Sequence, residues 1–515
     1  MPVNTRLFAQ GVSCYNQRTK KSLNQGPMHQ TPASTAAPLR RGWILIACML
    51  AMFMAAVEVT IVATAMPDII ASLGGFPLLS WVFSIYLLLQ AISIPIYGRL
   101  ADMFGRKPVF FVGTGLFLSG SILCGFASHM SALILFRALQ GLGAGAIVPL
   151  ATTIIADVYN QQERARLQGY LSSVWAVSAI IGPLMGAFIV RHYHWSGVFW
   201  VNVPLGIIST GLLARYLPAA PHRHDAPSLD VAGIAYMTLA VGCLLIALLQ
   251  GDELGRWRAG LLVLSVISAV LLVREQRRSA VPLFPLALWQ SKVIIAGNVG
   301  GLIIGAAMMG IAAFLPTYIQ AVLGGSTLEA GWTLAVMSLG WPLASTLCGR
   351  LMIHTSYRLM ALCGAVLLVA GSLLLLRLDA QSSIAAARLA SFVIGLGMGM
   401  SNTTFLVSVQ NEAPFAIRGI ATASTVFTRM VGSALGTAVL GATLNMNLQR
   451  RLPGIDDPVQ HLIAHHSHSG PGLAHMAQQV ALSMHGVYWV SSLIAFCALI
   501  AAGLVPRGLR PRQEE

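Results

Sequence analysis

Three charged residues stand inside long apolar stretches of this sequence: Glu58, Arg137 and Arg429. A charge within a membrane-spanning helix costs about 2.5–3.5 kcal/mol on insertion scales, so such residues usually have a partner or a task. Only Glu58 can exchange a proton, because burial disfavours the ionised carboxylate whereas a guanidinium stays protonated. We therefore expect Glu58 to carry a proton. The alternative is that it forms a permanent ion pair with an arginine.

The two arginines allow different interpretations. Arg137 lies towards the predicted outer end of its apolar stretch. Its guanidinium could therefore form an ion pair inside the protein or reach out to the lipid headgroups. Arg429 lies midway along its stretch, which favours a buried pairing or a place in a cavity.

The elements that position these residues follow from composition. The 515 residues are 56% hydrophobic and 10% charged, with a mean hydropathy of +0.73. Soluble domains are about a quarter charged, so the sequence excludes a soluble globular protein and predicts an all-α integral membrane protein. A helix needs about 20 apolar residues to cross the hydrocarbon core. Fourteen stretches qualify, near 43–66, 79–97, 108–128, 132–155, 169–190, 198–217, 231–250, 259–273, 293–319, 330–352, 359–377, 386–408, 419–444 and 486–506.

The distribution of basic residues predicts the orientation. With the N-terminus inside, 23 Lys and Arg fall on the cytoplasmic side and seven on the outer side. The positive-inside rule then places both termini in the cytoplasm. The net charge of +15 reflects this topology, so no nucleic-acid partner is predicted. Residues 1–41 lack the apolar core of a signal peptide and are predicted to be a disordered cytoplasmic tail.

A weak internal repeat predicts how the spans are grouped. Gly98-Arg99-Leu100 recurs as Gly349-Arg350-Leu351, and the glycines 141, 143 and 145 recur at 395, 397 and 399. Parallel repeats of this kind are a transporter architecture. We predict two six-helix bundles, over 42–217 (the first half) and 293–515 (the second half), with a linker and two inserted helices over 218–292. The second half includes an outer loop over 450–485 and a short cytoplasmic tail.

The loop between the second and third spans combines glycines with one acid and basic residues: Gly98, Asp102, Gly105 and Arg106. Glycine permits a sharp reversal, and an acid on a basic membrane face could pair with an arginine or cap a helix. A loop that only sets topology would explain the arginines but not Asp102.

The fifth span contains small residues around a proline: Ser178, Gly182, Pro183 and Gly186. Small residues at four-residue spacing let helix backbones approach, and the proline bends the helix. Ordinary helix packing is the alternative interpretation.

These motifs together resemble the major facilitator superfamily. The loop 98–107 looks like its signature G-x-L-a-D-x-x-G-R-K/R, which implies that Gly98, Asp102, Gly105 and Arg106 form a cytoplasmic gate motif. Arg137 in R-x-x-Q-G matches the family's fourth-helix motif, which implies a role in proton coupling. In the second half Ile353 stands where the acid of the loop would be, so only one half is expected to carry the gate.

Three further motifs extend the resemblance, the first to the superfamily's antiporters and the other two to its fourteen-helix drug:proton antiporter branch. Gly182-Pro183-x-x-Gly186 is similar to its antiporter motif, with Ser178 where glycine is common. Glu58-x-Thr60-Ile61-Val62 is similar to its first-helix string, with Glu58 where Asp is commoner. The stretch from Trp195 through Asn202 and Pro204 is similar to its entry to the sixth span.

The resemblance implies a proton-coupled antiporter that exports amphipathic compounds across the cytoplasmic (inner) membrane by alternating access. The alternatives are a proton-coupled uptake symporter on the same fold and a membrane receptor that transports nothing. No enzyme activity and no cofactor are predicted, and no G-x-x-x-x-G-K-[ST] string for ATP is present. The expected partners are the amphipathic substrate, protons and the lipid bilayer, and the sequence leaves open whether a periplasmic adaptor takes part.

The loop 450–485 is rich in histidine. Its members are His461, His465, His466, His468, His475 and His485. Such tracts can bind metal. Because no strict ligand spacing accompanies them, no metal site is predicted.

Overall fold

The computed structural model describes residues 38–74, 78–218, 230–249, 255, 257–279, 282–453, 459, 462 and 471–506. Within these ranges the chain is helical and contains no strand, which confirms the predicted all-α class. Most of the tail predicted over 1–41 lies outside the described residues, as do His461, His465, His466, His468 and residues 507–515.

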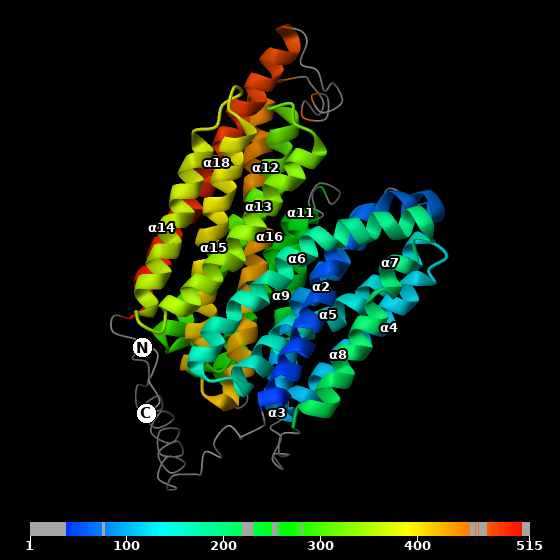
Figure 1. The fold of residues 1–515 in the computed structure, drawn as a ribbon, viewed down its shortest axis with the longest axis vertical. Coiled ribbons are helices and arrows are strands. Elements are labelled where there is room, and N and C mark those ends of the chain that lie inside the picture. The colour runs from blue at the N-terminus through cyan, green and yellow to red at the C-terminus, as the bar shows by residue number, and fades with distance from the viewer. Residues whose placement is uncertain are drawn as a thin grey trace, which may run out of the picture. The chain divides into compact units, whose positions relative to one another are not determined.

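Seven helices make up the described part of the first half (Figure 1). They are α2 (Pro38–Leu73), α3 (Leu79–Phe104), α4 (Arg106–Gly125), α5 (Met130–Val158), α6 (Gln161–His192), the short α7 (Gly197–Trp200) and α8 (Asn202–Tyr216). Gly105 separates α3 from α4 with a φ of 90°, a conformation that side chains other than glycine rarely adopt. A capping box of Asn160 and Glu163 begins α6 after the tight turn from α5.

Among the described residues, two helices and a short 3₁₀ turn connect the halves. They are α9 (Val231–Leu249), α11 (Trp257–Arg278) and η2 (Leu286–Trp289). Asp230 fixes the start of α9, because its carboxylate accepts hydrogen bonds from Gly233 N at 2.7 Å and from Gln276 Nε2 on α11 at 2.7 Å. The helix α9 contacts both α3 of the first half and α16 of the second.

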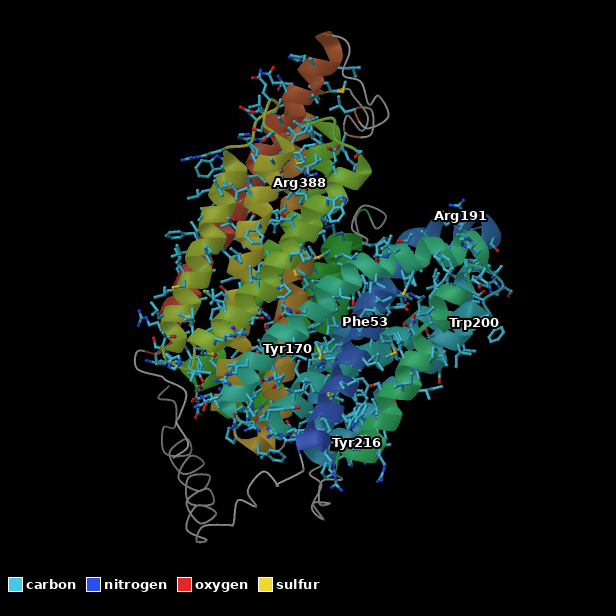
Figure 2. All side chains as sticks on the ribbon, in the orientation of Figure 1. Phe53, Tyr170, Arg191, Trp200, Tyr216 and Arg388 are labelled. Atoms are coloured by element: carbon cyan, nitrogen blue, oxygen red, sulfur yellow. The ribbon has the colours of Figure 1, made fainter. Side chains whose placement is uncertain are left out.

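Six long helices and a 3₁₀ turn make up the part of the second half that the structure describes. They are α12 (Lys292–Ala321), α13 (Thr327–Leu351), α14 (Tyr357–Leu376), α15 (Ile384–Glu412), η3 (Phe415–Ile417), α16 (Arg418–Arg451) and α18 (Pro471–Leu504). A large hydrophobic core joins α12 to α18, and separate cores fill the first half. In Figure 2, Arg191 and Arg388 lie towards one end of the helices and Tyr216 towards the other.

The repeated glycines perform the same packing in both halves. A Cβ on Gly141 of α5 would lie 2.5 Å from the carbonyl oxygen of Tyr86 on α3, so only glycine lets the two backbones approach this closely. Gly395 of α15 has the same relationship to Met337 of α13, at 2.2 Å. The internal repeat in the sequence therefore corresponds to a repeated helix–helix contact.

Three helices illustrate how the structure differs from the predicted spans. Thirteen of the described helices are long and apolar enough to cross a membrane. The span predicted over 330–352 forms α13, which is not among those thirteen; it contacts α15 and α6, and its polar Ser345 is buried whereas Leu343 and Leu347 are exposed. The loop predicted over 450–485 is shorter, because α16 continues to Arg451 and α18 begins at Pro471.

Candidate functional site

Glu58 on α2 and Arg137 on α5 form an ion pair inside the first half. Their side chains are 0% and 1% exposed, so neither reaches water or lipid. The guanidinium of Arg137 lies over the ring of Tyr86, with its carbon 4.1 Å from the ring centroid. Arg137 therefore does not extend to the headgroups, and that alternative is wrong.

A ring of neutral polar groups completes this pair. Asn202 of α8 donates from Nδ2 to Glu58 Oε2, and Arg137 donates from Nη1 to Gln140 Oε1 at 2.7 Å. Ser121 of α4 accepts from Gln140 Nε2 at 3.1 Å and from Asn202 Nδ2 at 2.9 Å. We call these five residues the Glu58 cluster. Four helices, α2, α4, α5 and α8, meet in it.

The contacts of the Glu58 cluster compensate the burial of both charges. Both carboxylate oxygens have a donor, which compensates the loss of hydration on burial. If Glu58 took up a proton, Arg137 would keep its bonds to Gln140 and to the carbonyl oxygen of Val82 at 3.3 Å. The ion pair is thus present, as one interpretation of Glu58 required, and without it Arg137 would keep two bonds, from Nη1 to Gln140 and from Nε to Val82.

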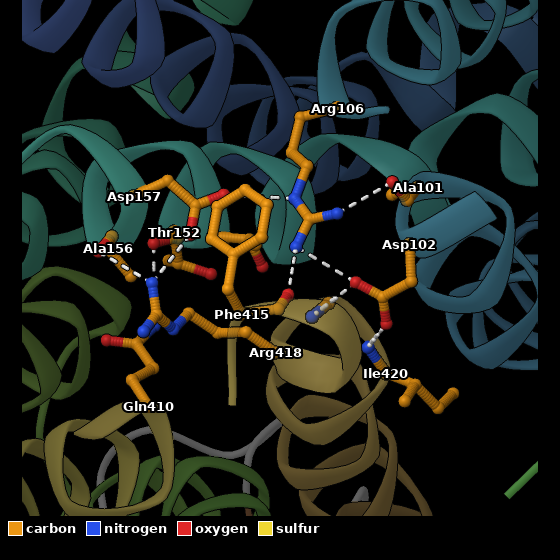
Figure 3. A network of polar contacts seen from close by, with 12 residues as sticks. Ala101, Asp102, Arg106, Thr152, Ala156, Asp157, Gln410, Phe415, Arg418 and Ile420 are labelled. Carbon is orange, nitrogen blue, oxygen red and sulfur yellow. Dashed lines mark hydrogen bonds and ion pairs between the residues drawn. The ribbon is translucent and has the colours of Figure 1, made fainter. Parts of the chain in front are cut away.

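A second polar network joins the two halves at the end of the molecule that carries the signature loop (Figure 3). Asp102 at the end of α3 accepts hydrogen bonds from the backbone N–H of Gly419 at 2.9 Å and of Ile420 at 2.8 Å. Its carboxylate thereby caps the N-terminus of α16, where the helix dipole favours negative charge. Arg106 also contacts Asp102, at 2.9 Å.

Arg106 extends this network along the junction. It donates to Asp157 Oδ2 at 2.9 Å, to the carbonyl oxygen of Phe415 at 3.0 Å and to that of Ala101 at 2.8 Å. Arg418 of the second half donates to the other oxygen of Asp157 at 2.8 Å. We call Asp102, Arg106, Asp157, Arg418 and the first residues of α16 the Asp102 network.

Sequence reasoning missed Asp157 and Gly419 in the Asp102 network, and it named Asn202 only as part of a motif, without its bond to Glu58. Asp157 looked like an ordinary acid at a helix end. A Cβ on Gly419 would lie 2.6 Å from Asp102 Oδ1, so this glycine lets the carboxylate reach the backbone. A polar side chain just inside an apolar span, such as Asn202, was the one signal available.

Close packing accompanies these bonds at the same end. Gly98 of α3 meets α16, where a Cβ would lie 2.5 Å from Ala423 Cβ. Gly349 of α13 meets α6, where a Cβ would lie 1.8 Å from the carbonyl oxygen of Ala165. Both glycines of the repeated Gly-Arg-Leu string therefore lie at junctions between the halves.

The second copy of the signature loop makes no comparable acid contact. Ile353 takes the place of the acid, and it lines a cavity of about 370 Å³ together with Arg166, Arg350 and His354. The predicted asymmetry between the two copies agrees with this geometry.

The residues of the antiporter motif lie on α6 and pack against α2, the helix that carries Glu58. A Cβ on Gly182 would lie 1.9 Å from Thr60 Oγ1, and one on Gly186 would lie 3.1 Å from the carbonyl oxygen of Ile61. Thr60 also donates to the carbonyl oxygen of Ser178 at 3.4 Å. Pro183 lies within α6, next to this contact. The motif thus packs inside its own half.

Arg429 lies apart from both clusters. It is half-buried on α16 and donates from Nη1 to Asn402 Oδ1 on α15 at 3.3 Å. No group of three or more His, Cys, Asp or Glu side chains with metal-binding geometry occurs among the residues that the structure describes.

Comparisons with known proteins agree with this architecture. The family model described as Major Facilitator Superfamily matches residues 48–437. The multidrug transporter protein MdtP of Bacillus subtilis is 33% identical over 79% of this chain and 76% of its own length. Multidrug resistance protein 3 of the same organism is 31% identical over 79% of this chain and 80% of its own.

A solved structure shows the same fold. The human organic anion transporter MFSD10 (TETRAN) superposes with a TM-score of 0.61 at 13% identity, covering 88% of this chain and 99% of its own. Together with the matching family model, the relatives and the apolar helices, this makes the chain a multi-pass membrane transporter rather than an enzyme. Because the family model covers most of its length, the chain belongs to the Major Facilitator Superfamily.

Proposed function

We propose that the protein exports amphipathic compounds across the cytoplasmic membrane in exchange for protons. The observation that carries the proposal is the Glu58 cluster, in which the carboxylate of Glu58 is fully buried against Arg137. Relatives named as multidrug transporters support the class of substrate.

Proton exchange at Glu58 would change the charge of the cluster. The ionised pair is neutral overall, whereas protonated Glu58 leaves the single positive charge of Arg137. A lone charge in a low-dielectric interior is unfavourable, so protonation weakens the cluster and ionisation restores it. Since α6 packs against α2 through Gly182 and Thr60, a shift of α2 that follows protonation is passed to α6.

The Asp102 network supplies the other half of an alternating-access cycle. It holds the halves together at one end, which the positive-inside count assigns to the cytoplasm. Export requires this end to open for substrate loading and to close again before release. Capping of α16 by Asp102 favours the closed form, so breaking that cap is the step that opens it.

Inverted membrane vesicles provide the test. Acidifying the vesicle interior reproduces the natural gradient, and an exporter should then accumulate a fluorescent amphipathic dye inside. Glu58→Gln should abolish this pH-driven accumulation while leaving dye binding measurable, because it keeps the shape and removes the titrating group. Glu329→Gln is the matched control, since Glu329 is a half-buried carboxylate in the first turn of α13 that bonds to Ser326 and lies outside the Glu58 cluster.

Two results would contradict the proposal. Loss of dye from wild-type vesicles on acidification would indicate uptake by symport. Wild-type pH dependence in Glu58→Gln would show that Glu58 is not the proton carrier.

A further inference from the structure

Arg429 places a positive charge at the middle of a membrane-spanning helix. It lies about 16 Å from the Arg418 end of α16, at 1.5 Å per residue. Its partner Asn402 lies about 15 Å from the Glu412 end of α15, at a matching depth. The contact at 3.3 Å therefore joins two helices deep in the second half.

This arginine is not balanced by an acid. Arg137 pairs with Glu58, whereas Arg429 has no carboxylate partner among the residues that the structure describes. The described acids of the second half stand at helix ends: Glu329 in the first turn of α13, Asp379 between α14 and α15, and Glu412 at the end of α15. Asn402 offers only a neutral amide oxygen.

The backbone keeps Arg429 at this depth. A Cβ on Gly305 of α12 would lie 1.9 Å from the carbonyl oxygen of Arg429, so the two helices are in direct backbone contact there. Neighbouring polar groups lie on the same helices: Thr428 donates to Asn298 Oδ1 at 3.4 Å and Ser433 donates to the carbonyl oxygen of Arg429 at 3.0 Å. The site thus has one cation surrounded by neutral polar groups.

A half-buried guanidinium with one neutral acceptor has donors left for an anion. Its planar fork matches the two oxygens of a carboxylate or sulfonate, and a charge-assisted pair of bonds there would offset part of the cost of holding the cation in the membrane. Glu58 offers no comparable place to a cationic compound, because both its oxygens are bound and it is fully buried.

We propose that Arg429 binds the acidic group of the transported compound, so that the substrates are amphipathic acids. This inference rests on the proposed export function and narrows its substrate class.

The test compares three probes with one aromatic skeleton: anthracene-9-carboxylate, its methyl ester, and a trimethylammonium analogue. Binding to purified full-length protein is measured by fluorescence, and transport is measured in inverted vesicles. Wild type should bind the acid at least about tenfold more tightly than the ester, a difference of about 1.4 kcal/mol. Arg429→Gln should bring the two affinities within about twofold, and Arg429→Lys should retain part of the preference. Arg388→Gln, a change of the same kind near the start of α15, should retain all of the preference.

Each outcome decides a separate point. Equal affinity of wild type for acid and ester overturns the inference, and pH-driven export of the ester would then leave the proposed function standing. Preference for the acid without pH-driven transport keeps the assignment of Arg429 and removes the export function. A preference that disappears when chloride replaces gluconate in the buffer would make Arg429 a chloride site and overturn the inference. If Arg429→Gln fails to fold, the affinities of the wild type and of Arg429→Lys for the acid and the ester still test the inference.

Discussion

Asp102 and Gly419 come from opposite halves of the chain and are joined by a hydrogen bond of 2.9 Å from the Gly419 backbone N–H to the Asp102 carboxylate. A side chain at the end of α3 thus serves as the N-terminal cap of α16. Because the cap exists only when the two helix ends meet, its free energy belongs to one conformation of the transporter and not to the fold in general.

Asp102→Asn should weaken closure of this end without unfolding the protein. Asparagine keeps the shape but removes the charge that the helix dipole and Arg106 stabilise, which is worth up to about 2 kcal/mol in partly buried geometry. We expect impaired efflux at normal membrane abundance, measured by dye export and immunoblotting. Asp68→Asn, at an exposed position of α2, is the control. Full efflux in Asp102→Asn would remove the gating role.

Gly349→Ala should obstruct the same closure by volume. The added methyl group would meet the carbonyl oxygen of Ala165, a backbone atom, at 1.8 Å, so α6 and α13 must separate. Gly331→Ala on the same helix meets nothing within 4 Å and should transport normally. Maleimide labelling of single cysteines at the α6–α13 junction should rise in Gly349→Ala only; equal labelling in both variants would show that the contact tolerates the methyl group.

Gly182→Ala should disturb coupling more than folding. Its methyl group would lie 1.9 Å from Thr60 Oγ1 and 2.9 Å from Thr60 Cβ, which forces α6 away from α2 at a cost of about 1–3 kcal/mol. We expect proton leak or weak efflux in vesicles. Pro183→Ala, which removes the helix bend at the neighbouring position, should act in the same direction. Gly211→Ala on α8, with open space around it, is the control; unchanged coupling in Gly182→Ala would reduce the motif to ordinary packing.

Asn202→Ala should destabilise the first half. It removes the donor to Glu58 Oε2 and leaves a buried charged oxygen without that partner, which costs about 1–3 kcal/mol or more. Thermal unfolding in detergent measures the loss. Ser209→Ala on the same helix removes a neutral bond to the carbonyl oxygen of Ala47 and should cost less. Equal melting temperatures for the two variants would show that the bond from Asn202 to Glu58 adds no more stability than the neutral bond of Ser209.

The features that could be predicted from sequence are those that depend on residues close together in the chain. Apolar length located the spans, and glycines at constant spacing identified the repeated contacts of Gly141 and Gly395. The charges of Glu58 and Arg137 were recognised because a charge within a span is conspicuous against its neighbours.

The partners of these charges could not be predicted, because they depend on packing between distant segments. Asp157 can form ion pairs with Arg106 and Arg418 only because α5 ends beside both arginines. The start of α18 was placed too late for a different reason: residues 471–485 are polar enough to fail a test for membrane crossing, yet they continue the helix beyond the apolar part.

The neutral pair of Glu58 and Arg137 has an electrical consequence. While both are ionised, displacement of the first half across the membrane field moves no net charge through this cluster. A proton on Glu58 changes that to one elementary charge, and 100 mV of membrane potential acts on one charge with about 2.3 kcal/mol. If Glu58 carries the proton as proposed, the membrane potential acts on this cluster only in its protonated form, so one carboxylate would both bind the proton and determine when the potential does work there.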